Sequence, residues 1–314
     1  MASALNTLNQ VKEVFVKLKE ELGKIIVGQE HIIEHVLISI LTNQNALLES
    51  YPGLGKTLLI KSISEILDLD FKRIQNTPDL MPSDVIGTYI IDESRGKKQF
   101  VFQKGPVFAN LVLADEINRA TPKTQAALLE AMAEKQVTVG NEKFELEAPF
   151  FILATQNPID QEGTYPLPEA QIDRFLLKIV LDYPNVKEEI EILNRFASNF
   201  KVPKLKPIIK KDSLLILQKL TRQVPISEDI KIRVAKIINK TRTNKELIAY
   251  GASPRATIGL ILASKARALI HGRKFVSNDD VNEMALPVLR HRIILNFKAE
   301  RSGLTIDDVI KKLL

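Results

Sequence analysis

The sequence predicts an α/β fold, in which a mostly parallel sheet lies between helices and a second, helical part follows. Apolar runs typical of buried strands alternate with helical patterns as far as Pro184, which is the order found in parallel sheets covered by helices. A glycine-rich turn, residues 50–57, separates one of these strands from the next helix. After Pro184 helical patterns alone continue, so no further strand is expected.

The elements of the first part follow from apolar spacing and from turn signals. Leu8, Val11 and Phe15 recur every three or four residues and predict the first helix. Thr121-Pro122 offers an N-cap and a proline at the first helical position. Helices are expected over 5–24, 30–43, 58–67 and 121–134, and buried strands over 46–49, 71–75, 111–115, 150–154 and 175–180.

Two hairpins interrupt this alternation. The first has its turn at Ser94-Arg95-Gly96 and follows loop signals at Thr77-Pro78 and Met81-Pro82. The second turns at Gly140-Asn141. Their strands are expected over 88–91 with 99–102 and over 137–139 with 144–146, and the two insertions over about 76–104 and about 136–147.

The residues after Pro184 predict helices only. A helix from Val186 to about Phe200 leads into Pro203 and Pro207, and the last helix begins with a capping-box pattern at Ser277-Asn278-Asp279-Asp280. The later helices are expected near 212–222, 227–242, 254–271 and 277–289. We place the domain boundary near residue 205, so that a core domain covers 1–205 and a helical domain covers 206–314.

Composition excludes several classes of protein. The chain has no cysteine, so it has neither a disulfide framework nor a thiolate metal site. The N-terminus lacks the basic start and apolar run of a secretory signal. No apolar run approaches the roughly 20 residues of a membrane span. We expect a cytoplasmic protein that does not insert into membranes.

Charge is divided unevenly along the chain. Residues 1–200 carry 20 Lys/Arg against 28 Asp/Glu, a net of −8, whereas residues 201–314 carry 24 against 10, a net of +14. The basic part has three interpretations: a solvated surface, a face that meets the acidic part of a neighbouring copy, or a nucleic-acid surface. It holds no basic cluster with interleaved aromatic residues, so nucleic acid is the least favoured of the three.

Residues 50–57, Ser-Tyr-Pro-Gly-Leu-Gly-Lys-Thr, have the pattern of a phosphate-binding loop. Gly53 and Gly55 allow the backbone to approach phosphate closely. Lys56 can reach the terminal phosphates, and the Thr57 hydroxyl can hold Mg²⁺. An ordinary glycine-containing turn is the alternative. Ser50 stands where the full G-x-x-x-x-G-K-[ST] pattern has its first glycine, which leaves the loop geometry open.

Two carboxylates, Asp115 and Glu116, directly follow the apolar run 111–114. Asp115 would hold Mg²⁺ through water, and Glu116 would orient and activate the attacking water. A pair of solvated acids at a strand end is the alternative. Because the pair follows a phosphate loop in the chain, the combination predicts hydrolysis of a nucleoside triphosphate.

Three more residues are candidates for the same site. Asn157 follows a buried strand and could position the attacking water, or it makes an Asn-Pro turn. Arg174 could reach a neighbouring copy's γ-phosphate, or it pairs with Asp173 or another acid of its own chain. Arg255 follows Ser253-Pro254 in the first turn of a helix. A cation there interacts unfavourably with the helix dipole, by roughly 0.3–1 kcal/mol. A phosphate bound at that helix end would remove the conflict; the alternative is an arginine that faces solvent.

Over about residues 20–300 the chain resembles the MoxR family of AAA+ ATPases. The run 154–175 is highly specific to this family, whereas the phosphate loop is not. Ser50 is the main departure. The matching runs are Ile26-Val27-Gly28-Gln29, Pro52–Thr57, Thr77–Asp84, Leu113–Glu134, Ala154–Phe175, Gly251–Arg255 and His291-Arg292-Ile293.

The resemblance implies an AAA+ P-loop core with a parallel sheet between helices and a C-terminal all-helical lid domain. It implies ATP and Mg²⁺ as cofactors. Mg²⁺ would be held by Thr57 and Asp115, and ATP by Ile26, Val27, Pro52, Gly53, Leu54, Gly55, Lys56, Thr57 and Leu58. Catalysis would fall to Glu116, to Asn157 as sensor 1, to Arg174 as an arginine finger acting in trans, and to Arg255 as sensor 2, in cis or in trans.

The resemblance also implies a ring, usually a hexamer, from which the hairpins 88–102 and 137–146 project toward a partner or a pore. It implies a protein partner with a von Willebrand factor A domain, which the ring remodels, matures or supplies with metal. The alternatives are a DNA-linked motor, a scaffold that binds ATP only to assemble, and a chelatase-like subunit. A DNA motor should bind DNA with a steep dependence on salt.

Overall fold

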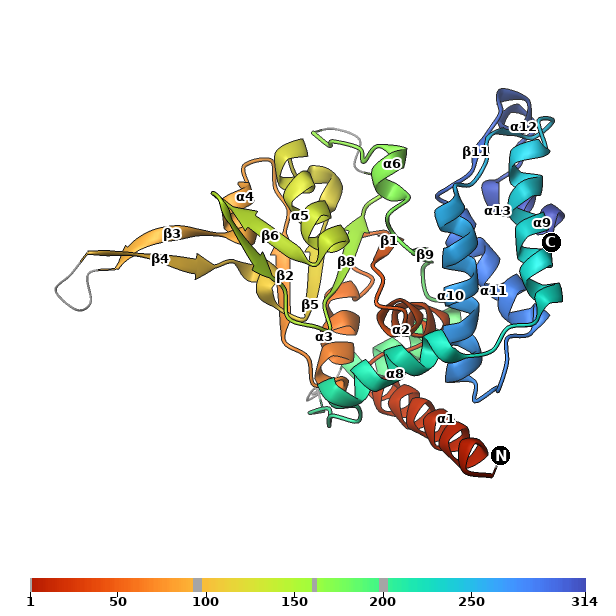
Figure 1. Ribbon diagram of the computed structural model, residues 1–314, viewed down its shortest axis with the longest axis horizontal. Helices are drawn as coiled ribbons and strands as arrows, with labels where there is room; N and C mark the ends of the chain where they lie inside the picture. Colours follow the sequence, from red (N-terminus) through yellow and green to blue (C-terminus); the bar gives the residue numbers. More distant parts are fainter. Residues whose placement is uncertain (1, 93–97, 160–162, 198–202) are drawn as a thin grey trace.

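The computed structural model describes residues 2–92, 98–159, 163–197 and 203–314. A five-stranded parallel sheet lies between helices, and a mainly helical part follows it in the chain (Figure 1). The fold class predicted from the sequence is therefore confirmed. Within the described ranges, no helix has both the length and the apolar character needed to cross a membrane.

The strands of the sheet are arranged in the order β2-β5-β8-β1-β9, and every neighbouring pair is parallel. Their bounds are Ala46–Ser50 for β1, Phe71–Gln75 for β2, Leu111–Asp115 for β5, Phe151–Gln156 for β8 and Leu177–Leu181 for β9. These bounds lie within two residues of the predicted ones. Because parallel strands end at a common edge, the carboxyl ends of β1, β8 and β5 lie side by side.

Helices cover both faces of this sheet. They are α1 (Ala2–Gly23), α2 (Glu30–Leu41), α3 (Lys56–Ile66), α4 (Pro82–Ile86), α5 (Pro122–Glu134) and α6 (Glu169–Ile172), with 3₁₀ turns η1 (Pro106–Phe108) and η2 (Ile117–Arg119). Successive side chains of a strand point to opposite faces. Leu111 and Leu113 therefore face a larger core with α1, α2 and α3, whereas Val112 and Ala114 face a smaller core with α4 and α5. Burial on both faces explains why these strands read as continuous apolar runs.

The C-terminal part, residues 203–314, packs on the larger core. Its elements are α8 (Lys211–Gln223), α9 (Glu228–Thr243), β10 (Ile248–Tyr250), α10 (Pro254–Ile270), α11 (Asn278–Leu289), β11 (Ile294–Leu295), α12 (Phe297–Arg301) and α13 (Ile306–Leu313). The capping box predicted at Ser277 is confirmed. The hydrophobic core runs without interruption from the sheet into these helices, and the boundary near residue 205 stays a prediction.

A short antiparallel pair, β10 with β11, corrects the expectation that strands end at Pro184. Its strands have three and two residues, which is too short to leave an alternating pattern in the sequence. A second correction concerns α4, which forms where prolines indicated loop. Pro82 stands in its first turn, where proline is tolerated, and Asp84 accepts a hydrogen bond from the Met81 N–H at 2.8 Å.

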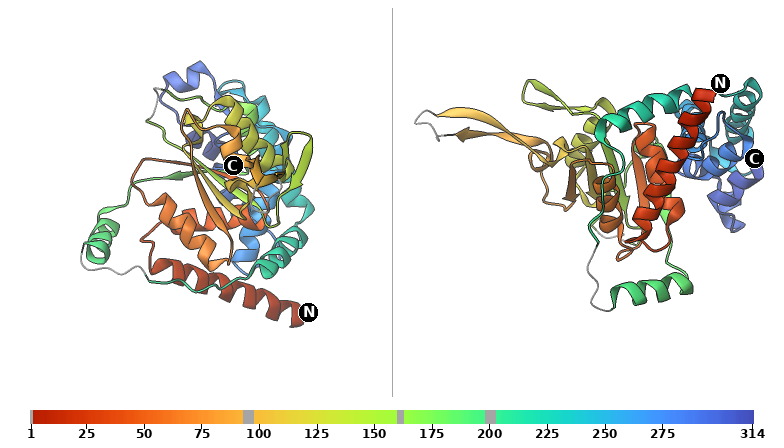
Figure 2. Two further views of the ribbon diagram at one scale, coloured as in Figure 1. Left: turned by 90° about the vertical axis from the view of Figure 1, so that its left-hand side faces the viewer. Right: turned by 90° about the horizontal axis from the view of Figure 1, so that it is seen from below.

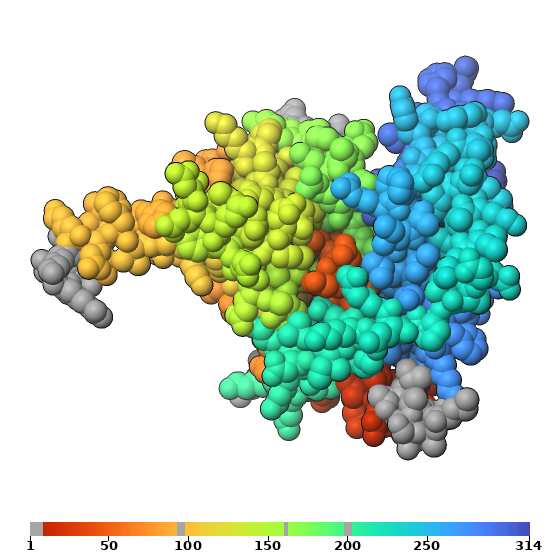
Figure 3. All heavy atoms as spheres, viewed as in Figure 1, coloured from red at the N-terminus to blue at the C-terminus, as the bar shows by residue number. Residues whose placement is uncertain are grey.

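The two predicted hairpins are present, as β3 (Gly87–Asp92) with β4 (Gln99–Lys104) and β6 (Gln136–Val139) with β7 (Glu142–Glu145). The turn predicted at Ser94-Arg95-Gly96 lies outside the described residues. The first hairpin projects far from the body of the molecule (Figures 1 and 3). Phe102 of this hairpin stacks on Phe144 of the second, with ring centroids 4.2 Å apart, and the Tyr89 hydroxyl donates to Glu142.

Two glycines close the base of the first hairpin. A Cβ on Gly87 would lie 2.2 Å from the carbonyl oxygen of Gln103, and one on Gly105 would lie 2.3 Å from that of Val85. Gly87 also has a φ of +99°, which an L side chain rarely adopts. The chain therefore leaves the core and returns to it at one point, where only glycine fits.

Helix α7 (Val186–Phe196) lies on the outside of the molecule (Figure 2), and Arg195 Nη1 donates to the Gly23 carbonyl at the end of α1 at 2.5 Å. It begins at Asn185, whose side chain accepts hydrogen bonds from two backbone N–H groups of the first turn. No residue of this helix is buried, and Val186, Ile190 and Leu193 expose more than half of their surface. The helix was predicted to reach Phe200, but residues 198–202 lie outside the described ranges.

Acid is expected to destabilise the fold through His35 of α2. Burial, together with the charge of His31, lowers the pKa of His35 from 6.5 to about 4. The unfolded chain takes up this proton near pH 6.5, whereas the folded chain does so only near pH 4, so stability falls as pH falls through that window. We expect this group to cost up to about 3 kcal/mol, measured by urea unfolding at a series of pH values.

The variant His35→Gln should flatten the slope of stability against pH between pH 6.5 and 4. The exposed neighbour His31 separates the two causes, because His31→Gln removes only the smaller contribution of its charge and leaves the burial of His35 intact. The slope should then decrease much less than in His35→Gln. A His35→Gln protein with the slope of the unchanged protein would contradict the assignment.

Candidate active site

The predicted phosphate loop joins the end of β1 to the start of α3. Gly53 and Gly55 have φ values of +83° and +75°, in the region that favours glycine. A Cβ on either would meet nothing within 4 Å, so the space beside the loop is open. Lys56 and Thr57 form the first turn of α3, and this turn contains no acidic residue. Its unpaired N–H groups and the helix dipole favour an anion at this point.

Ser50 lies in strand β1 rather than in the turn. It is buried, it pairs with Leu181 of β9, and its hydroxyl donates to the Tyr51 carbonyl at 3.1 Å. Ser50 does not adopt a positive φ. A serine therefore fits at this extended position, and the turn around Gly53 and Gly55 keeps its conformation.

The turn between α1 and α2 contacts the phosphate loop and also lines a cavity. Gln29 Nε2 donates to the Leu54 carbonyl at 3.3 Å, a contact that sequence reasoning did not predict. Ile26 and Val27 line a cavity of about 400 Å³, together with Arg195 of α7 and residues of α1 and α2. Two residues predicted to hold nucleotide thus line a cavity, and the turn that carries them contacts the phosphate loop through Gln29.

Thr155 of β8 fixes the two carboxylates at the end of β5. Its hydroxyl donates to Asp115 Oδ1 at 2.6 Å and accepts the Glu116 N–H at 2.8 Å. Thr155 is fully buried, and Asp115 is 6% exposed. Glu116 has a φ of +55°, an uncommon conformation for a residue with a side chain. The hydroxyl of Thr155 therefore fixes the orientation of the Asp115 side chain and stabilises the strained backbone conformation of Glu116.

Cationic and amide groups pair with these carboxylates. Arg73 of β2 donates to Asp115 Oδ2 through Nη2 at 2.6 Å and through Nε at 3.0 Å. Arg119 and Gln75 donate to Glu116 Oε2 at 3.1 and 3.3 Å. Sequence reasoning missed Arg73, because a single arginine on a strand belongs to no motif. A cation that binds Asp115 directly would have to displace Arg73 from it.

Asn157 lies at the same edge, just after β8. It is buried, and its Oδ1 accepts the Ile159 N–H at 3.1 Å. Strand β8 lies between β1 and β5, so the phosphate loop and Asp115 stand on either side of it, two strand spacings or about 10 Å apart. The parallel sheet thus gathers Lys56, Asp115, Glu116 and Asn157 at one edge.

The residues present fit a magnesium ion bound together with phosphates. Thr57 and Asp115 offer oxygen ligands, which Mg²⁺ prefers, and Mg²⁺ usually takes only one or two carboxylates beside water and phosphate. Within the described ranges, no group of three or more His, Cys, Asp or Glu side chains is arranged to hold a metal.

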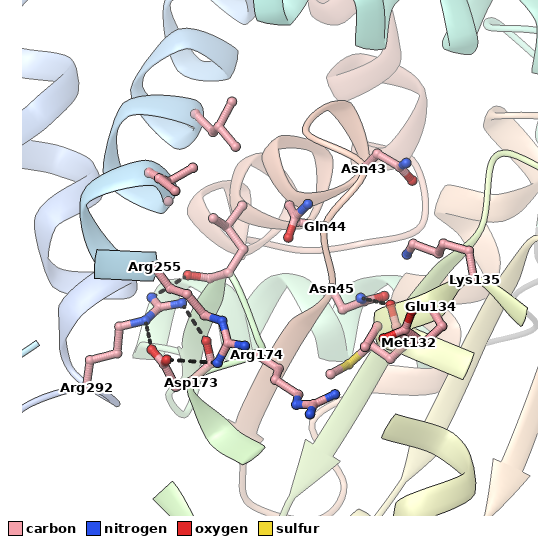
Figure 4. A pocket seen from close by; sticks show the side chains of 15 residues that line it. Asn43, Gln44, Asn45, Met132, Glu134, Lys135, Asp173, Arg174, Arg255 and Arg292 are labelled. Atoms are coloured by element: carbon pink, nitrogen blue, oxygen red, sulfur yellow. Dashed lines mark hydrogen bonds and ion pairs between the residues drawn. The ribbon is translucent and has the colours of Figure 1, made fainter. Parts of the chain in front are cut away.

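Arg174 and Arg255 lie elsewhere, in a cavity of about 390 Å³ that we call the arginine cavity (Figure 4). It lies between β1, the end of α5 and the start of α10, and Asp173 and Arg292 also line it. Its described lining includes no residue of the phosphate loop and neither carboxylate at the end of β5. The fold therefore separates these two arginines from the loop of their own chain.

The alternative pairing of Arg174 with Asp173 is not formed. Asp173 accepts instead from Arg292 Nε at 2.8 Å and from Arg255 Nη1 at 3.3 Å. The Arg174 guanidinium is exposed, and it has no hydrogen bond or ion pair with any residue that the structure describes. Among the described residues that line this cavity, Arg174 is thus an arginine whose guanidinium has no partner.

Ser253 begins α10 as predicted, but its side chain makes no capping hydrogen bond. Its hydroxyl turns to the Asp173 carboxylate, with distances of 2.9 and 3.0 Å to the two oxygens. An anion therefore does lie at this helix end, where the dipole favours it. That anion is Asp173 of the same chain.

Comparison with known proteins places this geometry in a family. The pattern of the ATPase family associated with various cellular activities (AAA) matches residues 45–177, and that of the AAA lid domain matches residues 240–313. The chain is 42% identical to Chaperone MoxR1 of Mycobacterium tuberculosis (strain ATCC 25618 / H37Rv), over 94% of this chain and 79% of that one.

Two further similarities span almost the whole chain. It is 41% identical to the uncharacterized protein YeaC of Bacillus subtilis (strain 168), over 95% of this chain and 92% of that one. A crystal structure at 2.00 Å resolution from Cytophaga hutchinsonii ATCC 33406, of a protein with only a provisional assignment as an ATPase, superposes with a TM-score of 0.91 at 43% identity. It covers 99% of this chain and 96% of that one.

Replacement of Thr155 by valine is expected to destabilise the protein. The variant keeps the shape of the side chain but leaves Asp115 Oδ1 and the Glu116 N–H without their shared partner. A buried polar group without a partner costs about 1–3 kcal/mol. Urea unfolding should report a loss of that size for Thr155→Val and a much smaller one for Thr155→Ser, which keeps the hydroxyl. Equal losses would show that the bridge is unimportant.

Proposed function

The chain belongs to the MoxR family of AAA+ ATPases, and we propose that it hydrolyses ATP within a ring of identical subunits and uses this reaction to remodel a protein partner. The observation that carries the proposal is the separation of two half-sites on one chain. Lys56, Asp115 and Glu116 lie at the edge of the sheet, whereas Arg174 and Arg255 lie in the arginine cavity. Two copies of the chain would complete one another.

The first half-site would bind ATP and water. Backbone N–H groups of the loop and the first turn of α3 would cradle the phosphates, with Lys56 on the terminal ones and Ile26 and Val27 beside the base. Glu116, held by the Thr155 bridge, would accept a proton from the attacking water, and Asn157 would orient that water. Mg²⁺, held by Thr57 and Asp115, would neutralise charge that develops on the phosphates. The products would be ADP and inorganic phosphate.

The second half-site would serve the nucleotide of a neighbouring subunit. Arg174 would stabilise charge on the transferred phosphoryl group in trans, as an arginine finger does. Arg255 lies in the same cavity as Arg174 and not at the phosphate loop. We therefore assign Arg255 to the neighbour's nucleotide as well, which is the trans option left open by the sequence.

Exposed apolar residues and charge support assembly of the ring, which we expect to be a hexamer. Helix α7 exposes Val186, Ile190 and Leu193 beside the cavity at Ile26, and apolar patches of this kind mark contact surfaces. Residues 1–200 are acidic and residues 201–314 are basic. Contact between unlike parts of neighbouring copies would bring these charges together.

The two hairpins are the proposed contact for the protein partner. The first exposes Ile91 at 56% and Phe100 at 77%, and Phe102 and Phe144 couple it to the second. A partner with a von Willebrand factor A domain, matured or loaded with metal by the ring, is the proposal taken from the family. The cytoplasmic location stays a prediction from the sequence.

Two alternatives stay open to experiment. A DNA-linked motor would bind DNA with an affinity that falls steeply with salt, and the basic C-terminal part is its only support. A scaffold that binds ATP without hydrolysing it would show no turnover. Phosphate release that disappears in Glu116→Gln would exclude the scaffold.

The division of the site predicts complementation between inactive variants. Lys56→Ala should lose ATP binding, because the loop loses its cation. Arg174→Ala should bind ATP normally but hydrolyse it at least about 10³-fold more slowly. Mixed rings of the two should regain activity, because an intact loop then meets an intact Arg174. Phosphate release measures this, and an Arg174→Ala protein with unchanged turnover would contradict the trans role.

Assembly should require nucleotide and weaken with salt. We expect Glu116→Gln to form a ring of about six subunits with ATP·Mg²⁺ and to be smaller without nucleotide, as measured by solution mass. Raising salt from 0.1 M to 1 M shortens the screening length from about 10 Å to about 3 Å. The ring should then dissociate. Assembly that is indifferent to salt would remove charge complementarity from the proposal.

A further inference from the structure

The three arginines of the arginine cavity differ in how many of their N–H groups are already used. A guanidinium has five N–H donors. Arg292 uses all five, on the carboxylate of Asp173 and on four backbone carbonyls. Arg255 uses one, and Arg174 uses none among the described residues. Arg292 is therefore a structural arginine, whereas the other two remain available to an incoming anion.

The bonds of Arg292 hold the backbone on both sides of Arg174. Its Nη2 donates to the carbonyls of Asp173 and Phe175, and its Nη1 donates to that of Leu176. Arg292 comes from the C-terminal part, between α11 and β11, whereas Arg174 belongs to the segment between α6 and β9. A residue more than 100 positions away thus fixes the segment that carries the candidate arginine finger.

Asp173 joins the same arrangement through its side chain. Its carboxylate accepts from Arg292 Nε and from Arg255 Nη1 (Figure 4). It also accepts from the Ser253 hydroxyl. The side chains of Arg292 and Asp173 are 3% and 16% exposed, whereas that of Arg255 is 59% exposed. The pair with Arg292 is therefore largely shielded from water, and the pair with Arg255 is open to it.

We propose that Asp173 and Arg292 are positioning residues that set Arg174 and Arg255 as one unit for the γ-phosphate of a neighbouring subunit's ATP. Arg292 fixes the backbone at Arg174, and Asp173 aligns the guanidinium of Arg255 through one nitrogen. The remaining donors of Arg255 stay free for phosphate. The inference rests on the proposed function, because it assumes that both arginines act in trans.

The pair also links the C-terminal part to the finger. Ser253, Arg255 and Arg292 all belong to the C-terminal part, and all three bind Asp173. The guanidinium of Arg292 belongs to the C-terminal part and binds the backbone on both sides of Arg174. A displacement of the C-terminal part would therefore also displace Arg174. The two arginines should therefore be presented together or withdrawn together.

Asp173→Asn tests the proposal. The variant keeps the size of the side chain but loses the charge that aligns Arg255 and neutralises Arg292. We expect kcat for ATP hydrolysis to fall about 10- to 100-fold, since displacement of a reacting group by about 1 Å has an effect of that size. The affinity of the same subunit for ATP should not change, because its phosphate loop is intact. Asp229→Asn, at an exposed position of the C-terminal part, is the matched control and should retain full activity.

Mixed rings separate this role from a general loss of structure. In a ring of mixed subunits, the Asp173→Asn subunit supplies an intact phosphate loop and the Lys56→Ala subunit supplies intact arginines. A complete site therefore forms wherever the Asp173→Asn subunit binds ATP next to a Lys56→Ala subunit that presents its arginines. Activity should return. The mixture of Arg174→Ala with Lys56→Ala is run in parallel. If that parallel mixture recovers and the Asp173→Asn mixture does not, the positioning role is wrong while the trans site stands.

Two other results would overturn the inference. Recovery in neither mixture would remove the trans site and the positioning role with it, and unchanged kcat in Asp173→Asn would remove the positioning role alone. Should Asp173→Asn fail to assemble, Arg292→Lys serves in the same mixtures. It keeps the charge beside Asp173 but cannot make five planar bonds. Its kcat should fall about 10-fold, and mixing with Lys56→Ala should restore it.

Discussion

The common direction of five parallel strands is the constraint on which the candidate active site depends. Because β1, β8 and β5 end at one edge, each loop that follows them delivers its polar residues to the same place. Residues far apart in the sequence, such as Lys56, Asp115 and Asn157, meet for this reason alone. The cores on both faces hold the strands in register, so packing in the interior determines the geometry at the edge.

The two half-sites are built by different means. At the edge of the sheet, one buried hydroxyl, that of Thr155, bonds both Asp115 and Glu116, and the site is rigid because a strand carries it. In the arginine cavity, the ion pair between Asp173 of the core and Arg292 of the C-terminal part fixes the arginines. One half is fixed within a sheet and the other across a packing interface, so only the second can respond when the C-terminal part moves.

The sequence sufficed where a feature rests on local pattern. The five strands, the loop at Gly53 and Gly55 and the carboxylates after β5 could be predicted, because apolar runs and turn residues mark them directly. The roles of Thr155, Arg73 and Asp173 could not be predicted, because each depends on a partner 40 or more positions away. The pair β10–β11 was missed because its strands, of three and two residues, are too short to show an alternating pattern. Helix α4 was missed because the proline in its first turn is equally typical of a loop.

The glycine closure of the first hairpin has a consequence for how such chains diversify. Gly87 and Gly105 bring the two ends of the insertion to one point on the core. The distance between these ends therefore stays the same, whatever the length of the chain between them. Residues can be added to or removed from the two strands in pairs at a cost in closure entropy that grows only slowly with length. We expect the length between these glycines to differ widely among relatives while the spacing of the sheet strands stays constant. The hairpin is thus a position at which evolution can change what the protein touches without changing how it folds.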